Sequence, residues 1–321
     1  MHSFEQLADL FKKKFETKHF PAEPASLYES CDYFLSIGGK RVRPVMCLMG
    51  NELFDEINPD AWHVATAIEL FHNFTLIHDD IMDAAPLRRG MQTVHTKYGD
   101  NTALLAGDVI MVVAYDYLNK ISNTYLHKVI TLFNRTAREV CEGQQLDLDF
   151  EKQQTVSLDA YIRMIELKTS VLLAASLQLG AILGGASEGN RQHIYEFGKN
   201  LGIAFQIQDD YLDAFGDPQK FGKDVGGDIR QNKKTFLLIH AMEAANELQK
   251  NTLLQLMEQN PADKVQRVLE IFKACDVDDW AWQLKQQYID KAFEHLDAIA
   301  VVSSRKKQLT ELANFLVQRE H

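Results

Sequence analysis

Two aspartate triplets with the same spacing are the residues in this sequence best suited to chemistry. The first triplet is Asp79, Asp80 and Asp83, and the second is Asp209, Asp210 and Asp213. Each follows an apolar helical stretch, so its outer aspartates would lie about 40° apart around a helix and about 6 Å apart along it. Three carboxylates this close resist ionising together unless a cation offsets their charge. One triplet alone would most often be an acidic helix end, but two predict a site for Mg²⁺ shared with substrate phosphates.

Basic residues in other segments could hold an anion bound to such metals. They are Lys40, Arg41 and Arg43 in a glycine-containing loop, Arg88 and Arg89 after the first triplet, Lys168 beside Thr169, and Lys220, Lys223, Lys233 and Lys234 after the second triplet. Arginine binds phosphate oxygens in a planar fork and lysine binds them as a point charge. Arg41, Lys220 and Lys234 are interpreted as solvated surface residues. The others predict a cavity that holds one or two diphosphates attached to apolar tails.

Helical periodicity and the placing of the prolines predict the elements that position these residues. Apolar residues recur at helical spacing, as at Leu70, Phe74 and Ile77. No proline falls between Pro86 and Pro218, a stretch rich in residues that favour helices. No run of alternating apolar and polar residues marks a sheet, and no flexible linker divides the chain. We therefore predict an all-α fold that forms a single helical domain over residues 1–321.

Composition and charge exclude several classes of protein. The chain has 321 residues, of which 46% are apolar and 25% charged, so a mainly disordered chain is excluded. A net charge of −11 offers no surface for nucleic acid or anionic membranes. The four cysteines form no metal or disulfide pattern, and no signal peptide is recognised. The most apolar run, residues 171–185, is too short to span a bilayer. We therefore expect a cytoplasmic protein without stable membrane insertion.

Several blocks of this sequence resemble those of the trans-isoprenyl diphosphate synthase family, also called the polyprenyl synthetase family. The blocks are Gly-Gly-Lys-Arg-Val-Arg-Pro at 38–44, His72 with Asp-Asp-Ile-Met-Asp at 79–83, Arg-Arg-Gly at 88–90, Gly-Gln-Gln-Leu-Asp at 143–147, Lys168 with Thr169, Phe-Gln-Ile-Gln-Asp-Asp-Tyr-Leu-Asp at 205–213, Gly222 with Lys223, and Gly-Gly-Asp-Ile at 226–229. The resemblance extends from Tyr28 to the C-terminal segments. One departure is Met-Gln-Thr at 91–93, where the family often has Lys-Pro-Thr; it affects a loop and no ligand.

The resemblance implies a fold, an oligomeric state and a set of site residues. The fold would be a single large bundle of long helices around a deep central cavity, the isoprenoid synthase fold, usually paired as a homodimer. Isopentenyl diphosphate would be held by Lys40, Arg43, His72 and Arg89, and the allylic diphosphate by Arg88, Lys168, Lys223 and Lys233. Mg²⁺, as three ions that Mn²⁺ can replace, would be bound directly by Asp79, Asp83 and Asp209, with Asp80, Asp210 and Asp213 acting through water or in support. His78 and His95 are expected to be structural.

The implied reaction is the head-to-tail condensation of isopentenyl diphosphate with dimethylallyl, geranyl or farnesyl diphosphate, catalysed by a Mg²⁺-dependent prenyltransferase. The metal would neutralise the leaving diphosphate, and Arg88, Lys168 and Lys223 would add fixed positive charge. Oxygens of Thr169 and Gln206 would face the allylic cation, which the apolar cavity shields from water. No side chain is assigned as the base, because the departing diphosphate is the family's usual candidate.

Two residues of the stretch before Asp79 bear on product length. In this family, adjacent aromatic residues four and five positions before the first aspartate accompany fifteen-carbon products, and one aromatic residue accompanies twenty-carbon products. Here these positions are Thr75 and Phe74. Geranylgeranyl diphosphate is therefore the expected product, and farnesyl diphosphate is the alternative.

Three other interpretations were weighed. A class I terpene cyclase also uses an aspartate-rich helix, but its second metal motif would differ from the one at 209–213. A non-catalytic subunit of a heteromeric synthase would have lost aspartates that this chain retains. A merely structural helical protein leaves the clustered carboxylates and cations unexplained.

Overall fold

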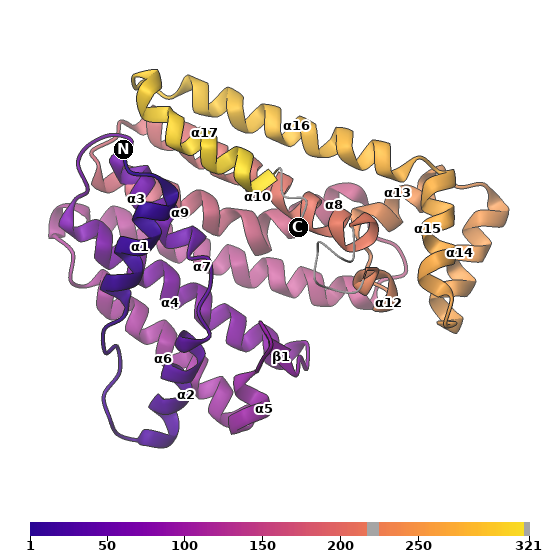
Figure 1. Ribbon diagram of the computed structural model, residues 1–321, viewed down its shortest axis with the longest axis horizontal. Coiled ribbons are helices and arrows are strands. Elements are labelled where there is room, and N and C mark those ends of the chain that lie inside the picture. Colours follow the sequence, from indigo (N-terminus) through magenta and orange to yellow (C-terminus); the bar gives the residue numbers. More distant parts are fainter. Residues whose placement is uncertain (217–224, 318–321) are drawn as a thin grey trace. The chain divides into compact units, whose positions relative to one another are not determined.

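The structure, a computed structural model, describes residues 1–216 and 225–317. In that part of the chain nearly all regular structure is helical, as the sequence predicts (Figure 1). The helices are α1 (Phe4–Phe15), α2 (Ala25–Ser36), α3 (Val42–Glu52), α4 (Pro59–Met82), α5 (Val94–Tyr98), α6 (Asp100–Leu118), α7 (Asn123–Lys152), α8 (Leu158–Ile165), the π-helical turn η1 (Glu166–Ser170), α9 (Val171–Leu183), α10 (Glu188–Phe215), α12 (Gly227–Arg230), α13 (Phe236–Ala244), α14 (Glu247–Gln259), α15 (Lys264–Ala274), α16 (Val277–Ala298) and α17 (Ser303–Val317).

The residues group into two compact units. The first unit comprises Met1–Phe133, Ser176–Arg191 and Val301–Gln308. The second unit comprises the described residues of 134–175, 192–300 and 309–321. The single domain over residues 1–321 stays a prediction.

In the first unit, α4 packs along α6 and α3 (Figure 1). Helix α4 begins where Asn58 accepts a hydrogen bond from the backbone N–H of Asp60, and Pro59 takes its first helical position. Helices α3 and α9 approach closely, because a Cβ added to Gly180 would lie 1.9 Å from the carbonyl oxygen of Cys47. The middle of α4 is buried without interruption over residues 64–71, and its C-terminal end carries the first aspartate triplet.

A two-stranded hairpin follows α4, which the sequence pattern did not predict. Strands β1 (Leu87–Arg88) and β2 (Met91–Gln92) pair antiparallel, with Leu87 opposite Gln92. The two turn residues, Arg89 and Gly90, have φ angles of 52° and 77°. Two successive positive φ angles define the tight hairpin turn whose twist matches that of its strands. Strands of two residues are too short to show alternation, so only the Arg-Gly pair could have marked this turn.

In the second unit, the core lies among α8, α10 and the helices from α13 to α16. Phe236, Phe272 and Ile207 are buried at its centre. Lys168 and Thr169, expected in a regular helix, lie in η1, where the backbone N–H of Val171 reaches the carbonyl of Glu166, five residues earlier. Such π turns are rare and occur frequently at functional sites.

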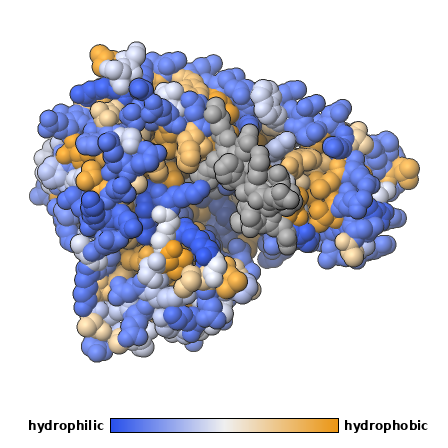
Figure 2. Space-filling view, viewed as in Figure 1, coloured by the Kyte–Doolittle hydropathy of each residue, from blue (hydrophilic) through white to orange (hydrophobic). Residues whose placement is uncertain are grey.

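Two helical segments are long and apolar enough to cross a membrane by length and composition, Asp100–Leu118 and Leu158–Leu183. The second segment is 78% buried. The buried core helix of a soluble protein passes the same test of length and composition. The run at 171–185, judged too short from sequence, is thus continued towards the N-terminus by α8 and η1. Hydrophilic residues cover most of the face shown in Figure 2, with smaller hydrophobic patches between them.

Candidate active site

The first aspartate triplet lies at the C-terminal end of α4. Asp79 and Asp80 belong to its last turn, and Asp83 is the residue directly after it. The last turn contains no basic residue. Because the C-terminal end of a helix carries partial negative charge, three carboxylates here repel both one another and the helix end. The arrangement therefore favours a bound cation.

Arg88 of the hairpin forms a two-pronged ion pair with Asp80. Its Nε donates to Oδ2 at 2.9 Å, and its Nη2 donates to Oδ1 at 2.8 Å. The Asp80 side chain is almost fully buried. Nη1 of Arg88 takes no part in this ion pair. It can therefore donate to another acceptor while Asp80 fixes the plane of the guanidinium. Asp80 is thus paired with an arginine assigned to the allylic diphosphate, and its role as a support of the metal stays a prediction.

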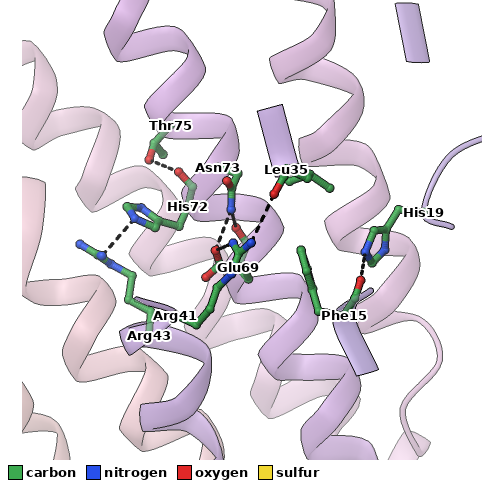
Figure 3. Close-up of polar contacts among 9 residues, drawn as sticks. All are labelled: Phe15, His19, Leu35, Arg41, Arg43, Glu69, His72, Asn73 and Thr75. Atoms are coloured by element: carbon green, nitrogen blue, oxygen red, sulfur yellow. Dashed lines mark hydrogen bonds and ion pairs between the residues drawn. The ribbon is translucent and has the colours of Figure 1, made fainter. Parts of the chain in front are cut away.

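A second cationic group gathers around His72, about two helical turns from Asp79 along α4 (Figure 3). Nη1 of Arg43 donates to Nε2 of His72 at 3.1 Å. Burial, followed by the charges of Arg43, Arg89 and other arginines, holds the pKa of His72 well below its ordinary value, so the imidazole is neutral and accepts. Within the described residues, Nε of Arg43 is buried without a hydrogen-bond partner. A buried donor without an acceptor, amid excess positive charge, fits an anion.

Arg41 was interpreted from sequence as a solvated surface residue, and that interpretation is wrong. Its side chain is only 12% exposed and forms an ion pair with buried Glu69. Glu69 also accepts from Nδ2 of Asn73 at 2.9 Å (Figure 3). Arg41 has a φ angle of 52° at the start of α3, a conformation that L-residues rarely adopt. The Arg41–Glu69–Asn73 network therefore fixes the loop that precedes Arg43 against α4.

The hairpin and the glycine-containing loop meet at Arg89. A Cβ added to Gly39 would lie 2.7 Å from Nη1 of Arg89, so the guanidinium lies directly against the glycine. A side chain at Gly39 would therefore displace this guanidinium. Lys40, next in the loop, is exposed. The first unit thus brings Arg89 of the hairpin against the loop that contains Lys40 and Arg43, and all three residues are assigned to isopentenyl diphosphate.

The second triplet lies near the C-terminal end of α10. Asp210 is buried and accepts hydrogen bonds from the hydroxyl of Tyr161 and from Nε2 of Gln206. Burial, and then the charge of Asp228, raises the pKa of Asp210 to about 7. Asp209 and Asp213 are partly exposed. As in the first triplet, the carboxylates lack a compensating positive charge on their own helix end.

Asp228, which follows the second triplet in the sequence, contacts Asp213 of that triplet. The backbone N–H of Asp228 donates to Oδ2 of Asp213 at 2.9 Å, and the Asp228 carboxylate lies 3.4 Å from Nζ of Lys233. Lys234, interpreted from sequence as a solvated residue, is instead partly buried and donates to the carbonyl of Phe150 at 2.9 Å. Lys220 and Lys223 lie outside the described residues. Lys233 is therefore the predicted diphosphate lysine that the structure places beside the second triplet.

The π turn η1 positions the side chains of Lys168 and Thr169. Nζ of Lys168 forms an ion pair with Asp147 of α7, and Oγ1 of Thr169 donates to Oε1 of Gln206 at 3.3 Å. Two glycines permit this approach: a Cβ on Gly143 would lie 2.2 Å from the backbone nitrogen of Lys168, and one on Gly202 would lie 2.8 Å from Ser170. Three of the predicted catalytic groups are therefore positioned by α7, η1 and α10 of the second unit.

Comparisons with known proteins agree with this geometry. The sequence profile described as polyprenyl synthetase matches residues 24–274. The chain belongs to the polyprenyl synthetase family. It is similar to the geranylgeranyl pyrophosphate synthase of Geoglobus acetivorans, with 38% identity over 317 residues that cover 98% of this chain and 97% of the relative.

Solved structures of the same family have the same fold. A geranylgeranyl pyrophosphate synthase crystal structure superposes with a TM-score of 0.94 at 41% identity, covering 100% of both chains. The geranylgeranyl pyrophosphate synthetase of Pyrococcus horikoshii Ot3 gives 0.92 at 37% identity, covering 98% of both chains. The predictions of an all-α isoprenoid synthase fold and of a prenyltransferase are thereby confirmed.

Metal dependence is a property of the polyprenyl synthetase family, and the donor set here fits it. Among residues 1–216 and 225–317, no group of three or more histidine, cysteine or acidic residues is close enough to hold a metal by itself. Mg²⁺ is usually bound by one or two carboxylates, with waters and substrate phosphates completing its shell. In the first unit the carboxylates at the C-terminal end of α4 fit such an ion. In the second unit the carboxylates near the end of α10, with the raised pKa of Asp210, do so as well.

Three residues of this family member were missed as site residues by sequence reasoning. Asp147 pairs with Lys168, Asp228 joins Asp213 and Lys233, and Tyr161 bonds to Asp210. Asp147 and Asp228 each lie in a sequence block that carried the family resemblance, so the blocks themselves were the signal. Tyr161 lies in no such block, and no feature of the sequence singles it out.

Proposed function

We propose that this member of the polyprenyl synthetase family condenses isopentenyl diphosphate with allylic diphosphates, head to tail, to give geranylgeranyl diphosphate. The observation that carries the proposal is the partly buried Arg43–His72 pair: the buried, unpartnered Nε of Arg43 fits an anion separate from the one that Arg88 serves. Two anion sites suit two diphosphate substrates. The similarity to geranylgeranyl diphosphate synthases, in sequence and in structure, supports the twenty-carbon product.

Mg²⁺ is the proposed metal, as three ions for which Mn²⁺ can substitute. Asp79, Asp83 and Asp209 would hold it directly, and Asp80, Asp210 and Asp213 would act through water or as supports. When bound, the metal supplies positive charge that neutralises the leaving diphosphate. Arg88, Lys168 and Lys233 add fixed positive charge from the chain, and the pairing of Lys168 with Asp147 sets the direction of its ammonium group.

The reaction breaks the carbon–oxygen bond of the allylic substrate and forms a carbon–carbon bond to isopentenyl diphosphate, after which one proton leaves. Oγ1 of Thr169 and Oε1 of Gln206 are held together by their hydrogen bond, so both oxygens are available to the developing allylic cation. The second hydrogen bond of Gln206, to Asp210, fixes the orientation of its amide. The departing diphosphate takes the proton, since no side chain is assigned as the base.

A product assay tests this function. Purified protein is incubated with Mg²⁺, isopentenyl diphosphate and each of dimethylallyl, geranyl and farnesyl diphosphate, and the products are sized by mass. Growth to the twenty-carbon diphosphate is expected with all three primers. Farnesyl diphosphate alone is the control for a terpene cyclase, because a cyclase would release a volatile hydrocarbon from it. That outcome would replace the proposed function.

Phe74→Ala is expected to lengthen the product by at least one five-carbon unit, and Thr75→Phe to shorten it. Both positions lie about 6–7.5 Å from Asp79 along α4, which is one to one and a half helical turns. The ring of Phe74 is only partly buried, so part of its surface is open to a ligand. Mass analysis of the products is the measurement. An unchanged distribution for Phe74→Ala would show that its ring is ordinary packing.

We also propose a homodimer that forms through α6. Leu104, Leu105 and Val112 are 49%, 53% and 61% exposed and share one face of this apolar helix. Light scattering should give twice the chain mass of 36.6 kDa. Leu105→Glu combined with Val112→Glu should halve that value, whereas Leu248→Glu on α14, where Leu248 is 77% exposed, should leave it unchanged. A wild-type monomer would contradict the proposal.

A further inference from the structure

The imidazole of His78 is held in one position by three close contacts in the first unit, and its Nε2 also lies 3.8 Å from Oδ1 of Asp108 on α6. Its Nε2 lies 3.1 Å from the carbonyl oxygen of Leu104 on α6, so Nε2–H is the donor. A Cβ added to Gly107 would lie 2.3 Å from the same nitrogen, so the ring occupies the space that glycine leaves open. The third contact is with Phe74, one turn earlier on α4, at 4.8 Å between ring centres and 69° between ring planes.

The contact between the two rings restrains Phe74. An edge-to-face pair of this geometry is favourable beyond the area that it buries. Phe71 contacts Phe74 on the other side, with ring centres 5.6 Å apart. The Phe74 ring is therefore fixed by an aromatic neighbour on each side. Of these two neighbours, His78 is anchored to a second helix, α6. Phe71 is fully buried.

We propose that His78 is a positioning residue for product length: it fixes the Phe74 ring and, through Leu104 and Gly107, makes α6 part of the length control. The inference rests on the proposed function, in which the Phe74 ring limits the growing chain. Sequence reasoning assigned His78 only as structural, because a lone helix histidine usually is. The contact with Phe74 connects it to the substrate instead.

The test compares product distributions of His78→Ala and Gly107→Ala with those of wild type and Phe74→Ala. Without its imidazole partner, Phe74 can turn into the vacated space, so His78→Ala should raise the proportion of products longer than wild type by about two- to tenfold. The methyl group of Gly107→Ala displaces the imidazole from α6 and should also shift the distribution. In Phe74→Ala/His78→Ala, loss of the imidazole should add no further lengthening.

Controls separate this inference from general damage and from the proposed function. His63→Ala, on the same helix and in contact with Tyr117, should leave product length unchanged. His78 directly precedes Asp79, and Gly107→Ala leaves His78 itself unchanged. Gly107→Ala therefore still tests the inference if His78→Ala loses activity. If Phe74→Ala lengthens the product while His78→Ala and Gly107→Ala match wild type, the inference is overturned and the proposed function stands. If Phe74→Ala changes nothing, the assumed length control fails instead, and the proposed role of His78 with it.

Discussion

Asp79→Ala and Asp209→Ala are each expected to lower turnover by about 10³-fold, the loss that follows from removing ~4 kcal/mol of charge stabilisation by a bound metal. Each carboxylate is partly exposed near the C-terminal end of its helix. Neither side chain is buried in the core, so the fold should remain intact. Turnover is measured with isopentenyl and farnesyl diphosphates at saturating Mg²⁺, and circular dichroism checks the fold.

The same charges predict how stability responds. Carboxylates at a helix C-terminal end are unfavourable by ~0.3–1 kcal/mol each, so the metal-free Asp79→Ala protein should melt no lower than wild type. Adding Mg²⁺ with inorganic diphosphate should raise the melting temperature of wild type and raise it less for the variant. Glu258→Ala is the matched control, because Glu258 is an exposed carboxylate in the last turn of α14. It should behave as wild type in both measurements.

Two outcomes would contradict the metal site. Full turnover in excess EDTA would show that no divalent cation takes part. Normal turnover of Asp79→Ala, with Asp209→Ala inactive, would restrict the site to the second triplet.

Much of the fold followed from local features of the sequence. The absence of proline between Pro86 and Pro218, together with helical periodicity, depends only on neighbouring residues and correctly predicted long helices. The aspartate triplets were located at helix ends for the same reason. The hairpin and the π turn were missed because each differs from its surroundings by only a few residues. A two-residue strand shows no alternation, and the extra residue of η1 leaves the apolar pattern almost unchanged.

The pairing of charges was less predictable, because it depends on which helices pack together. Arg41 and Arg43 are two positions apart, yet Arg41 is neutralised by Glu69 while Arg43 keeps an unpartnered nitrogen. Nothing in the loop sequence distinguishes them, since the difference arises from α4. Tyr161 is similar: it matters only because α8 places its hydroxyl against Asp210.

The two neighbouring arginines of the hairpin should give opposite kinetic defects. The turn at Arg89 and Gly90 reverses the chain, so Arg88 pairs with Asp80 while Arg89 lies against Gly39. Arg88→Ala should raise KM for the allylic substrate by about 10- to 100-fold, since a hydrogen bond to a charged group contributes ~1.5–3 kcal/mol. Arg89→Asn should raise KM for isopentenyl diphosphate by a similar factor. Asparagine is chosen because it tolerates the positive φ angle at this position.

Arg88→Ala also leaves the buried carboxylate of Asp80 without its partner, a change that typically costs ~3–5 kcal/mol of stability. The double variant Arg88→Ala/Asp80→Asn removes that unpaired charge and separates the two effects. Its melting temperature should recover towards wild type, while its KM for the allylic substrate should stay raised, because Nη1 of Arg88 is still missing. If both arginine variants raise KM for the same substrate, the hairpin does not divide its arginines between two diphosphates. If the double variant instead restores the allylic KM, Arg88 acts only by neutralising Asp80 and binds no substrate.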